Sequence, residues 1–245
     1  AGFVVDRVGA RPVLFAGLAL LATATLAGAF VPGVGWLFPV VAAAGIYVYA
    51  VFDTSVAGAW QSVERISAGA LPLSGLARSL HRYASDALVV TVALHAGREW
   101  AYRRYASVHR FAWLTGALLI GFVFASGTGG FWLVWDRLAQ FSIVATVEWL
   151  DVLPLFAEPL SRNFVDGAMI SDRLFSLLMF LHIGIPLGML ALMWIHVQRL
   201  HLPTTQPPRR IAAGTLAALT LLSLAFPVAS DAPATFDVVP AQLDL

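Results

Sequence analysis

The sequence predicts an all-α integral membrane protein, a helical bundle with about six transmembrane spans. Hydrophobic residues make up 59% of the 245 residues and charged residues only 12%, whereas a soluble domain is usually about 25% charged. The apolar residues are also gathered into segments long enough to cross a bilayer, for which a helix needs roughly 20 residues. Composition and segment length therefore both indicate a helical bundle embedded in a membrane.

Six apolar segments are candidate spans: residues 12–31, 36–53, 80–102, 111–131, 174–200 and 211–229. Proline and glycine in "VPGVGW" separate the first two. Residues 57–67 have the pattern of a short amphipathic surface helix, and the polar connection 132–173 is long enough to hold short helices of its own. We therefore expect an extra N-terminal membrane segment (1–35), a helical core (36–202), and a further membrane helix with a tail (203–245).

The distribution of arginine predicts how the bundle is oriented. Arginines cluster after the third predicted span, at 98, 103, 104 and 110, and after the fifth, at 199, 209 and 210. Cytoplasmic loops are enriched in such residues, so the acidic 132–173 connection is expected outside a bacterial inner membrane that the chain crosses several times. The absence of cysteine excludes disulfides and cysteine-ligated iron–sulfur clusters. A net charge of +1 indicates no nucleic-acid partner.

Two predicted spans carry a pair of histidines at the same spacing. His81 and His95 in "SLHRYASDALVVTVALH" are fourteen residues apart, as are His182 and His196 in "LHIGIPLGMLALMWIH". Fourteen helical residues return to within roughly 40° of the starting direction and rise about 21 Å. Because one span separates these two helices, they run parallel, and we expect His81 to face His182 and His95 to face His196.

Facing imidazoles on parallel helices are suited to hold two iron porphyrins, one at each level. A flat macrocycle needs room, which glycines without a Cβ would provide at Gly116 and Gly130, also fourteen apart, and at Gly45. Arg78 and Arg98 could pair with the propionates. Zinc is disfavoured because the two histidines of one helix are too far apart to share one ion. The alternatives are histidines that hydrogen-bond a neighbour and glycines that serve ordinary helix packing.

The motifs around these residues resemble a known family. "ARSLHRYAS", "LHAGR", the Gly116 and Gly130 pair, "FLHIGIPLGMLALMWIH", "VQRLH" and "TSVAGAWQSVERI" resemble the N-terminal, haem-carrying half of cytochrome b from quinol-oxidising bc- and bf-type complexes, over about residues 36–202. The resemblance implies a four-helix bundle with two b haems. His81 and His182 would bind the outer one, and His95 and His196 the inner one.

The resemblance also implies quinone sites and partners. His201 falls where the family has a histidine at its inner quinone site, and Trp135 and Asp136 fall near the outer quinol site, although Val134 replaces the family's proline. The Pro-Glu-Trp-Tyr loop of the family's C-terminal half does not occur in this chain. The implied partners are membrane lipid, quinone and iron–sulfur or cytochrome c type subunits, and the resemblance allows a homodimer.

Three functions compete at this point. The expected one is a diheme subunit that transfers electrons between quinol or quinone and a redox partner in a larger oxidoreductase, with Asp136, Glu148 and His201 as candidates for proton exchange. Alternatively, Asp136 and Glu148 are solvated loop acids and His201 is a solvated histidine at the membrane interface. The second function is a haem-bearing membrane anchor whose partner carries the catalysis. The third is a transporter fragment, because "GFVVDRVGARP" resembles a loop motif of major facilitator transporters.

Overall fold

The computed structural model describes residues 36–70, 72–154, 158–159, 170–198, 200 and 207–235. Within this part of the chain the regular elements are helices, and the only pairing outside them is an isolated bridge between Asp136 and Pro233. The helices are α3 (Leu37–Tyr49), α4 (Ala59–Ser67), α5 (Ser74–Ala101), the short 3₁₀ helix η2 (Ser107–His109), α6 (Arg110–Trp132), α7 (Arg137–Asp151), α9 (Asp172–Gln198) and α10 (Arg209–Ala225). The predicted all-α fold class is confirmed.

The predicted spans correspond to these helices. The 36–53 segment contains α3, and the 80–102, 111–131, 174–200 and 211–229 segments overlap α5, α6, α9 and α10, each of which begins one to six residues earlier. The 12–31 segment lies outside the described residues, as does the transporter-like motif. Among the described helices, α6 and α9 are long and apolar enough to cross a membrane. The expected surface helix is α4, and the long connection contains α7. The count of six spans stays a prediction.

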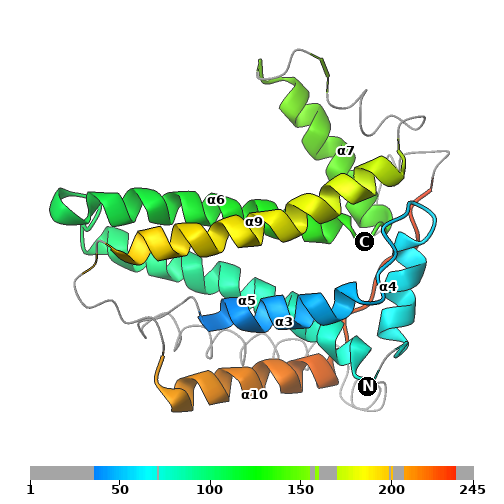
Figure 1. The fold of residues 1–245 in the computed structure, drawn as a ribbon, viewed down its shortest axis with the longest axis horizontal. Helices are drawn as coiled ribbons and strands as arrows, with labels where there is room; N and C mark the ends of the chain where they lie inside the picture. Colours follow the sequence, from blue (N-terminus) through cyan, green and yellow to red (C-terminus); the bar gives the residue numbers. More distant parts are fainter. Residues whose placement is uncertain are drawn as a thin grey trace.

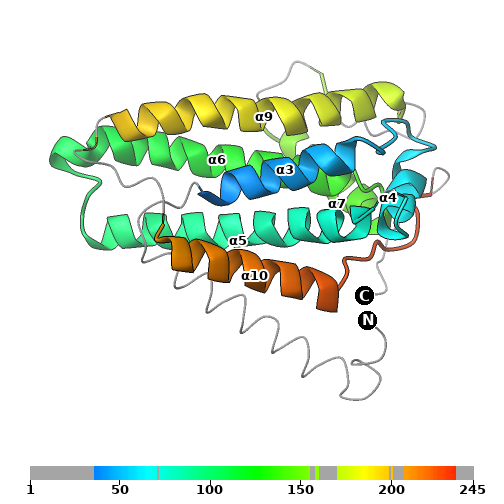
Figure 2. The same cartoon turned by 60° about the horizontal axis from the view of Figure 1, so that its bottom comes forward.

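Two helix pairs form the body of the molecule. α6 packs along α9 and α3 packs along α5, with few contacts between the two pairs, and α10 lies beside α5 (Figure 1). The chain runs in the same direction through α5 and α9, as predicted (Figure 1). Figure 2 shows the same elongated bundle from a second side, with α4 and α7 at the end where α5 and α9 begin.

The side-chain cores lie at two places. One is at the α4 and α7 end, where α4, α6, α7 and α9 bury residues such as Trp135, Ile143 and Phe175. The other lies along α3, α5 and α10, around Ala87, Leu88 and Leu219. Among the described residues, neither cluster joins α5 to α9.

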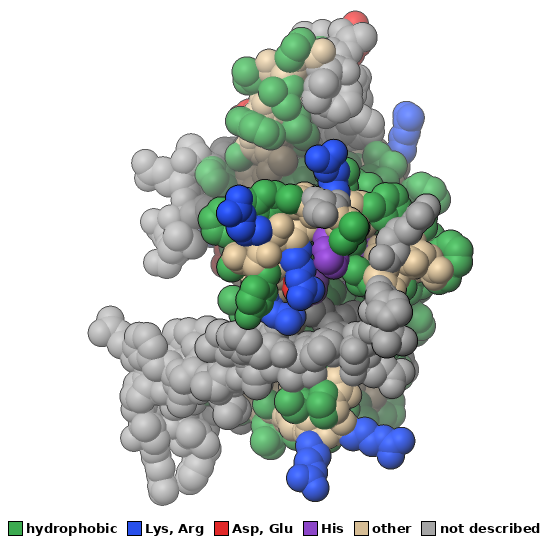
Figure 3. Space-filling model, turned by 90° about the vertical axis from the view of Figure 1, so that its left-hand side faces the viewer, with side chains coloured by type: hydrophobic (Ala, Val, Ile, Leu, Met, Phe, Trp, Pro, Cys, Tyr) green, Lys and Arg blue, Asp and Glu red, His purple; other side chains and the backbone are tan. Residues whose placement is uncertain are grey.

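The outside of the bundle is apolar. Phe124, Phe180 and Trp194 are 71%, 71% and 65% exposed, and such side chains on long apolar helices are suited to lipid. Arginines gather at the end where α5 leads into α6 and where α10 begins (Figure 3). This is the charge asymmetry that the predicted orientation requires.

A C-terminal strap, residues 226–235, follows α10 and crosses to the turn between α6 and α7. The Arg137 N–H donates to the carbonyl of Ala232 (2.9 Å), and the Ala234 N–H donates to the carbonyl of Trp135 (3.2 Å). The Gln140 amide donates to the Thr235 carbonyl (2.6 Å) and accepts from the Thr235 N–H (3.1 Å). The strap therefore ties the chain after α10 to the turn that begins α7.

Candidate functional site

His81 on α5 and His182 on α9 face each other across the interior between the helix pairs. Their ring centroids are 6.0 Å apart and the rings are nearly perpendicular, at 81°. A metal–imidazole bond is about 2.0–2.1 Å long, so two imidazoles on opposite sides of one ion have centroids roughly 6 Å apart. The spacing of these two rings therefore fits a pair of axial ligands.

Hydrogen bonds to backbone carbonyls set the tautomer of both rings. Nδ1 of His81 lies 2.9 Å from the Val41 carbonyl oxygen, and Nδ1 of His182 lies 2.9 Å from the Ser126 carbonyl oxygen. A carbonyl can only accept, so Nδ1 carries the proton and Nε2 carries the lone pair. Ligating histidines in proteins are oriented in this way, and both rings present a nitrogen that can bind a metal.

His196 has a comparable arrangement at the second level. Its Nδ1 lies 3.0 Å from the Thr115 hydroxyl, whose oxygen is also 2.9 Å from the Phe111 carbonyl and 3.1 Å from the Ala112 carbonyl. The single hydroxyl proton goes to a carbonyl of its own helix, so the hydroxyl can accept from Nδ1–H, together with the backbone of Ala112, to which His196 is also hydrogen-bonded. His196 also interacts electrostatically with His95. His95 and His196 therefore lie within electrostatic range of each other, and their role as a ligand pair stays a prediction.

The three glycines singled out by the sequence each lie against a histidine ring. A Cβ atom on Gly130 would lie 2.5 Å from Cε1 of His182, one on Gly45 would lie 2.8 Å from Cε1 of His81, and one on Gly116 would lie 3.1 Å from Cε1 of His196. The first two distances leave no room for a side chain. The glycines were expected to make room for a macrocycle. In the structure they make room first for the histidine rings.

The glycines and the accepting carbonyls share one geometric rule. Val41 is four residues before Gly45, and Ser126 is four residues before Gly130. In a helix the Cβ of a residue tilts toward the preceding turn and covers it. A glycine uncovers the carbonyl four residues earlier, and the histidine ring then reaches that carbonyl. This spacing is the signal in the sequence that could have revealed the second partners of the histidines.

The two predicted propionate partners differ in their surroundings. Arg78 is buried and hydrogen-bonded to the hydroxyls of Ser67 and Ser230, the latter at 2.7 Å, and it lies 3.6 Å from Glu64. Arg98, at the other end of α5, lies 3.4 Å from Glu99 and its guanidinium is 5.8 Å from the ring centre of Tyr102. Their pairing with propionates stays a prediction.

The predicted outer quinone residues lie at the end of the molecule that α4, α7 and the strap cover, which we call the capped end. Asp136 is 6% exposed and caps α7: one carboxylate oxygen accepts from the Ala139 N–H (2.8 Å) and the other from the Asp231 N–H in the strap (3.2 Å). It is therefore not a solvated loop acid, because helix and strap enclose it. Trp135 is 2% exposed and packs edge-on against Phe175 at 5.0 Å.

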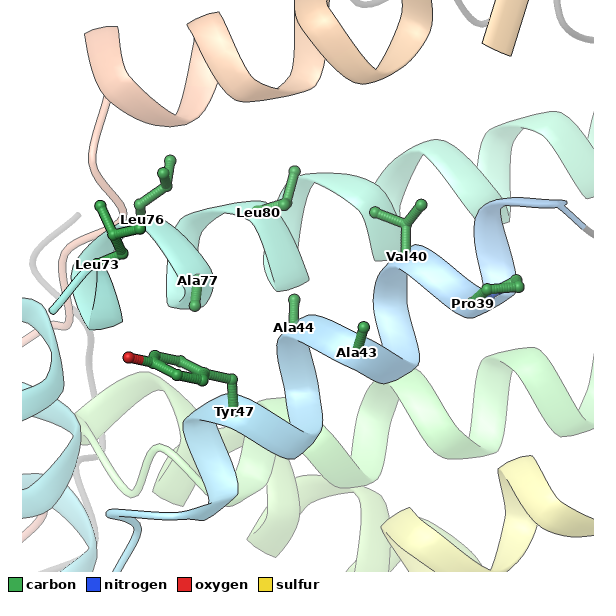
Figure 4. Close-up of a pocket in the computed structure, with 9 residues that line it drawn as sticks. All are labelled: Pro39, Val40, Ala43, Ala44, Tyr47, Leu73, Leu76, Ala77 and Leu80. Atoms are coloured by element: carbon green, nitrogen blue, oxygen red, sulfur yellow. The ribbon is translucent and has the colours of Figure 1, made fainter. Parts of the chain in front are cut away.

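The remaining candidates lie apart from these. Glu148 is exposed on α7, as a solvated loop acid would be. His201 lies outside the described residues. An open apolar groove of about 490 Å³ runs between α3 and α5 (Figure 4). Its lining side chains include Ala44 and Leu80 but no histidine. This groove is suited to a lipid chain and is separate from the histidine site.

Comparison with known proteins decides the family. The model of the family described as "Cytochrome b/b6/petB" matches residues 26–204. The chain belongs to the cytochrome b family. It is 23% identical over 167 residues to a cytochrome b of Rickettsia typhi, covering 68% of this chain and 42% of that protein. It is 22% identical to one of Candida parapsilosis, covering 68% and 43%.

The fold agrees with this assignment. A solved structure titled "Hyperthermophilic respiratory Complex III" is similar with a TM-score of 0.66 and 16% identity, covering 98% of this chain and 72% of that one. This cytochrome b chain spans less than half the length of the curated relatives it matches. Cytochromes b are haem proteins of membranes, and the spacing of His81 and His182 fits such a cofactor.

Proposed function

We propose that this cytochrome b chain is a diheme subunit that carries electrons between quinol or quinone and a redox partner within a larger respiratory-type complex. The observation that carries the proposal is the facing pair of His81 and His182, at 6.0 Å, each with Nδ1 committed to a carbonyl. His95 and His196 would hold a second haem at the other level. The membrane is proposed to be a bacterial inner membrane, crossed several times.

A haem with two histidine ligands supplies a one-electron carrier without an open coordination position. The chain's own residues orient the histidine rings and exclude water from the interior. The carbonyls of Val41 and Ser126 accept from Nδ1 of His81 and His182, which leaves the Nε2 lone pairs for a metal, and Thr115 holds Nδ1 of His196. The apolar exterior of α6 and α9 keeps water away from the interior.

The separation of the two levels matches transfer across a membrane. Fourteen helical residues rise about 21 Å, which is most of a hydrocarbon core of about 30 Å. Electrons would therefore pass between the capped end and the arginine-rich end of the bundle. We propose quinone sites near the two ends, with His201 at the arginine-rich end and Trp135 and Asp136 at the capped end.

One observation favours the second candidate function, a haem-bearing anchor without quinone chemistry of its own. Both carboxylate oxygens of Asp136 accept backbone hydrogen bonds, so this acid serves to hold α7 and the strap in place. In the anchor, a partner subunit would supply the electrons. A competitive quinone analogue that blocks haem reduction by quinol would support the first function, and reduction insensitive to it would support the anchor.

A pyridine haemochrome spectrum with a redox titration tests the proposal. We expect two b haems per chain that titrate separately, and one haem in each of the variants His182→Leu and His95→Leu. The matched control is His109→Leu, because His109 lies in η2, outside both pairs. Full haem content in the two ligand variants would contradict the proposed ligand sets.

A further inference from the structure

Glu99 lies between two arginines at the end of α5. Its Oε1 is 3.4 Å from Nη1 of Arg98, and its Oε2 is 3.2 Å from Nη1 of Arg104. The Glu99 side chain is only 17% exposed, whereas the two arginine side chains are 33% and 45% exposed. Because a charge that is largely withdrawn from water is screened less by the solvent, this carboxylate acts on neighbouring groups more strongly than a surface acid does.

The turn that ends α5 brings Arg104 back to Glu99. Arg103 has a left-handed backbone conformation, with φ 56°. Its N–H donates to the Trp100 carbonyl (2.8 Å), and the Arg104 N–H donates to the Glu99 carbonyl (3.0 Å). These two hydrogen bonds form a Schellman motif, which closes a helix and reverses the chain. The ion pair between Arg104 and Glu99 is therefore supported by the backbone as well as by the side chains.

Glu99 is an isolated negative charge at the arginine-rich end. It is the only acidic residue between positions 87 and 135, and the sequence has none between 173 and 230. These two stretches contain the whole of α6 and all of α9 after its first residue. Neither helix therefore brings a second carboxylate to the level of His95 and His196.

Both histidines of that level are within the electrostatic range of Glu99. Glu99 follows His95 by four residues on α5, and side chains at this spacing lie on one helix face with their Cβ atoms about 5–6 Å apart. The carboxylate interacts electrostatically with His95 and also with His196 on α9. Arg98 and Arg104 act on His95 in the opposite sense. The field at the predicted haem position is therefore set by this group of three charges.

A fixed charge beside a haem changes its reduction potential. The oxidised haem carries one positive charge more than the reduced haem, so a nearby carboxylate favours the oxidised form and lowers the potential. A unit charge roughly 10 Å away, at an effective dielectric constant of about 20, changes a one-electron equilibrium about tenfold. The two arginines oppose the carboxylate, and they are more exposed than it is.

We infer that Glu99 lowers the reduction potential of the haem held by His95 and His196, and that Arg98 and Arg104 keep its carboxylate in position. The role of Glu99 rests on the proposed function, because it requires a haem at this level. The haem of His81 and His182 lies about 21 Å away along the helix and is outside its influence. Glu99 thus sets the difference between the two potentials, which drives electron transfer between the levels.

A redox titration of the full chain in its purified complex tests this role. Glu99→Gln should shift the haem of His95 and His196 about tenfold toward the reduced form, a rise of about 59 mV for one electron, and leave the other haem unchanged. The variant His95→Leu identifies which of the two transitions belongs to this level. Unchanged potentials, an equal shift of both haems, or loss of the haem from Glu99→Gln would overturn the inference. A parent protein without haem would overturn the proposed function itself.

Two further variants separate charge from structure. Arg104→Gln should shift the same haem in the opposite direction, to a lower potential, and by a smaller factor because Arg104 is 45% exposed. Glu99→Asp keeps the negative charge and should shift the potential by much less than Glu99→Gln does. A higher potential in Arg104→Gln, or equal shifts in the two Glu99 variants, would show that the packing of the turn and not the charge of Glu99 sets the potential.

Discussion

The capped end and the histidine interior of this protein are built on opposite principles. At the capped end, α4, α7 and the strap close over Trp135 and Phe175. Backbone N–H groups there donate hydrogen bonds to backbone carbonyls and to the Asp136 carboxylate. In the interior between the helix pairs, histidines bond backbone carbonyls that glycines leave uncovered. The first region is stabilised by its own side chains, whereas the second is shaped for a group that the chain must bind.

This difference has a consequence for mutations. A change at the capped end removes contacts between parts of the chain and should lower stability, since a lost cap or hydrogen bond costs free energy of unfolding. A change in the interior displaces a ligand ring and should lower haem content. Four variants test this division, beginning with the largest expected effect.

Gly130→Ala should remove one haem per chain. The new Cβ would lie 2.5 Å from Cε1 of His182, whose ring is held by the Ser126 carbonyl, so the ring must leave that position. The haemochrome spectrum should fall from two haems to one. Gly121→Ala is the matched control, because a Cβ there meets nothing within 4 Å and alanine favours a helix by about 1 kcal/mol over glycine. Equal haem content in both variants would show that the contact between the His182 ring and Gly130 does not determine haem binding.

Thr115→Val should weaken the haem site at the His95 and His196 level. Valine keeps the shape but removes the hydroxyl beside Nδ1 of His196 and leaves the backbone of Ala112 as the remaining partner. We therefore expect a loss of haem affinity toward the lower end of the range of about ten- to hundredfold that is typical for such partners. Titration of haem into the haem-free protein measures this, with one of two sites affected. Thr115→Ser, which keeps the hydroxyl, should bind haem as the parent does.

Asp136→Ala should lower stability and spare haem. The change removes the cap of α7 and the contact with the Asp231 N–H, and a lost cap costs about 0.5–2 kcal/mol. Unfolding in detergent, followed by tryptophan fluorescence, measures the difference in free energy. Asp136→Asn, whose amide oxygen still caps the helix, should lose less. Haem loss in the alanine variant with unchanged stability would reverse the proposed division of the molecule.

Trp60→Phe should have the smallest effect. It removes one hydrogen bond, from Nε1 to the Asp231 carbonyl (2.9 Å), which is worth about 0.5–1.5 kcal/mol. Amide hydrogen exchange should become faster in the strap, near Asp231, and stay unchanged in α5. Trp149→Phe is the control, since Trp149 is 64% exposed on α7. Exchange that is equally fast in both variants would show that Trp60 does not hold the strap.

Much of the site can be predicted from the sequence because it depends on single helices. The fourteen-residue spacing sets the face and level of each histidine, and the number of intervening spans sets the parallel direction, so helix geometry alone places His81 opposite His182. The role of Asp136 is not predictable in this way. Its carboxylate is enclosed by the strap, which comes from 95 residues further along the chain, and no local pattern indicates that return.

The sequence by itself determined the helices, their apolar character and the pairing of the histidines, because helix geometry and the length of a bilayer act on local stretches of chain. Only the tertiary structure decided which carbonyls hold the rings and where the strap ends. Val41 is 40 residues from His81, and Ser126 is 56 residues from His182. Every residue carries the same backbone carbonyl, and the glycine four residues later marks which one is uncovered, but only the packing of one helix against another brings a histidine to it.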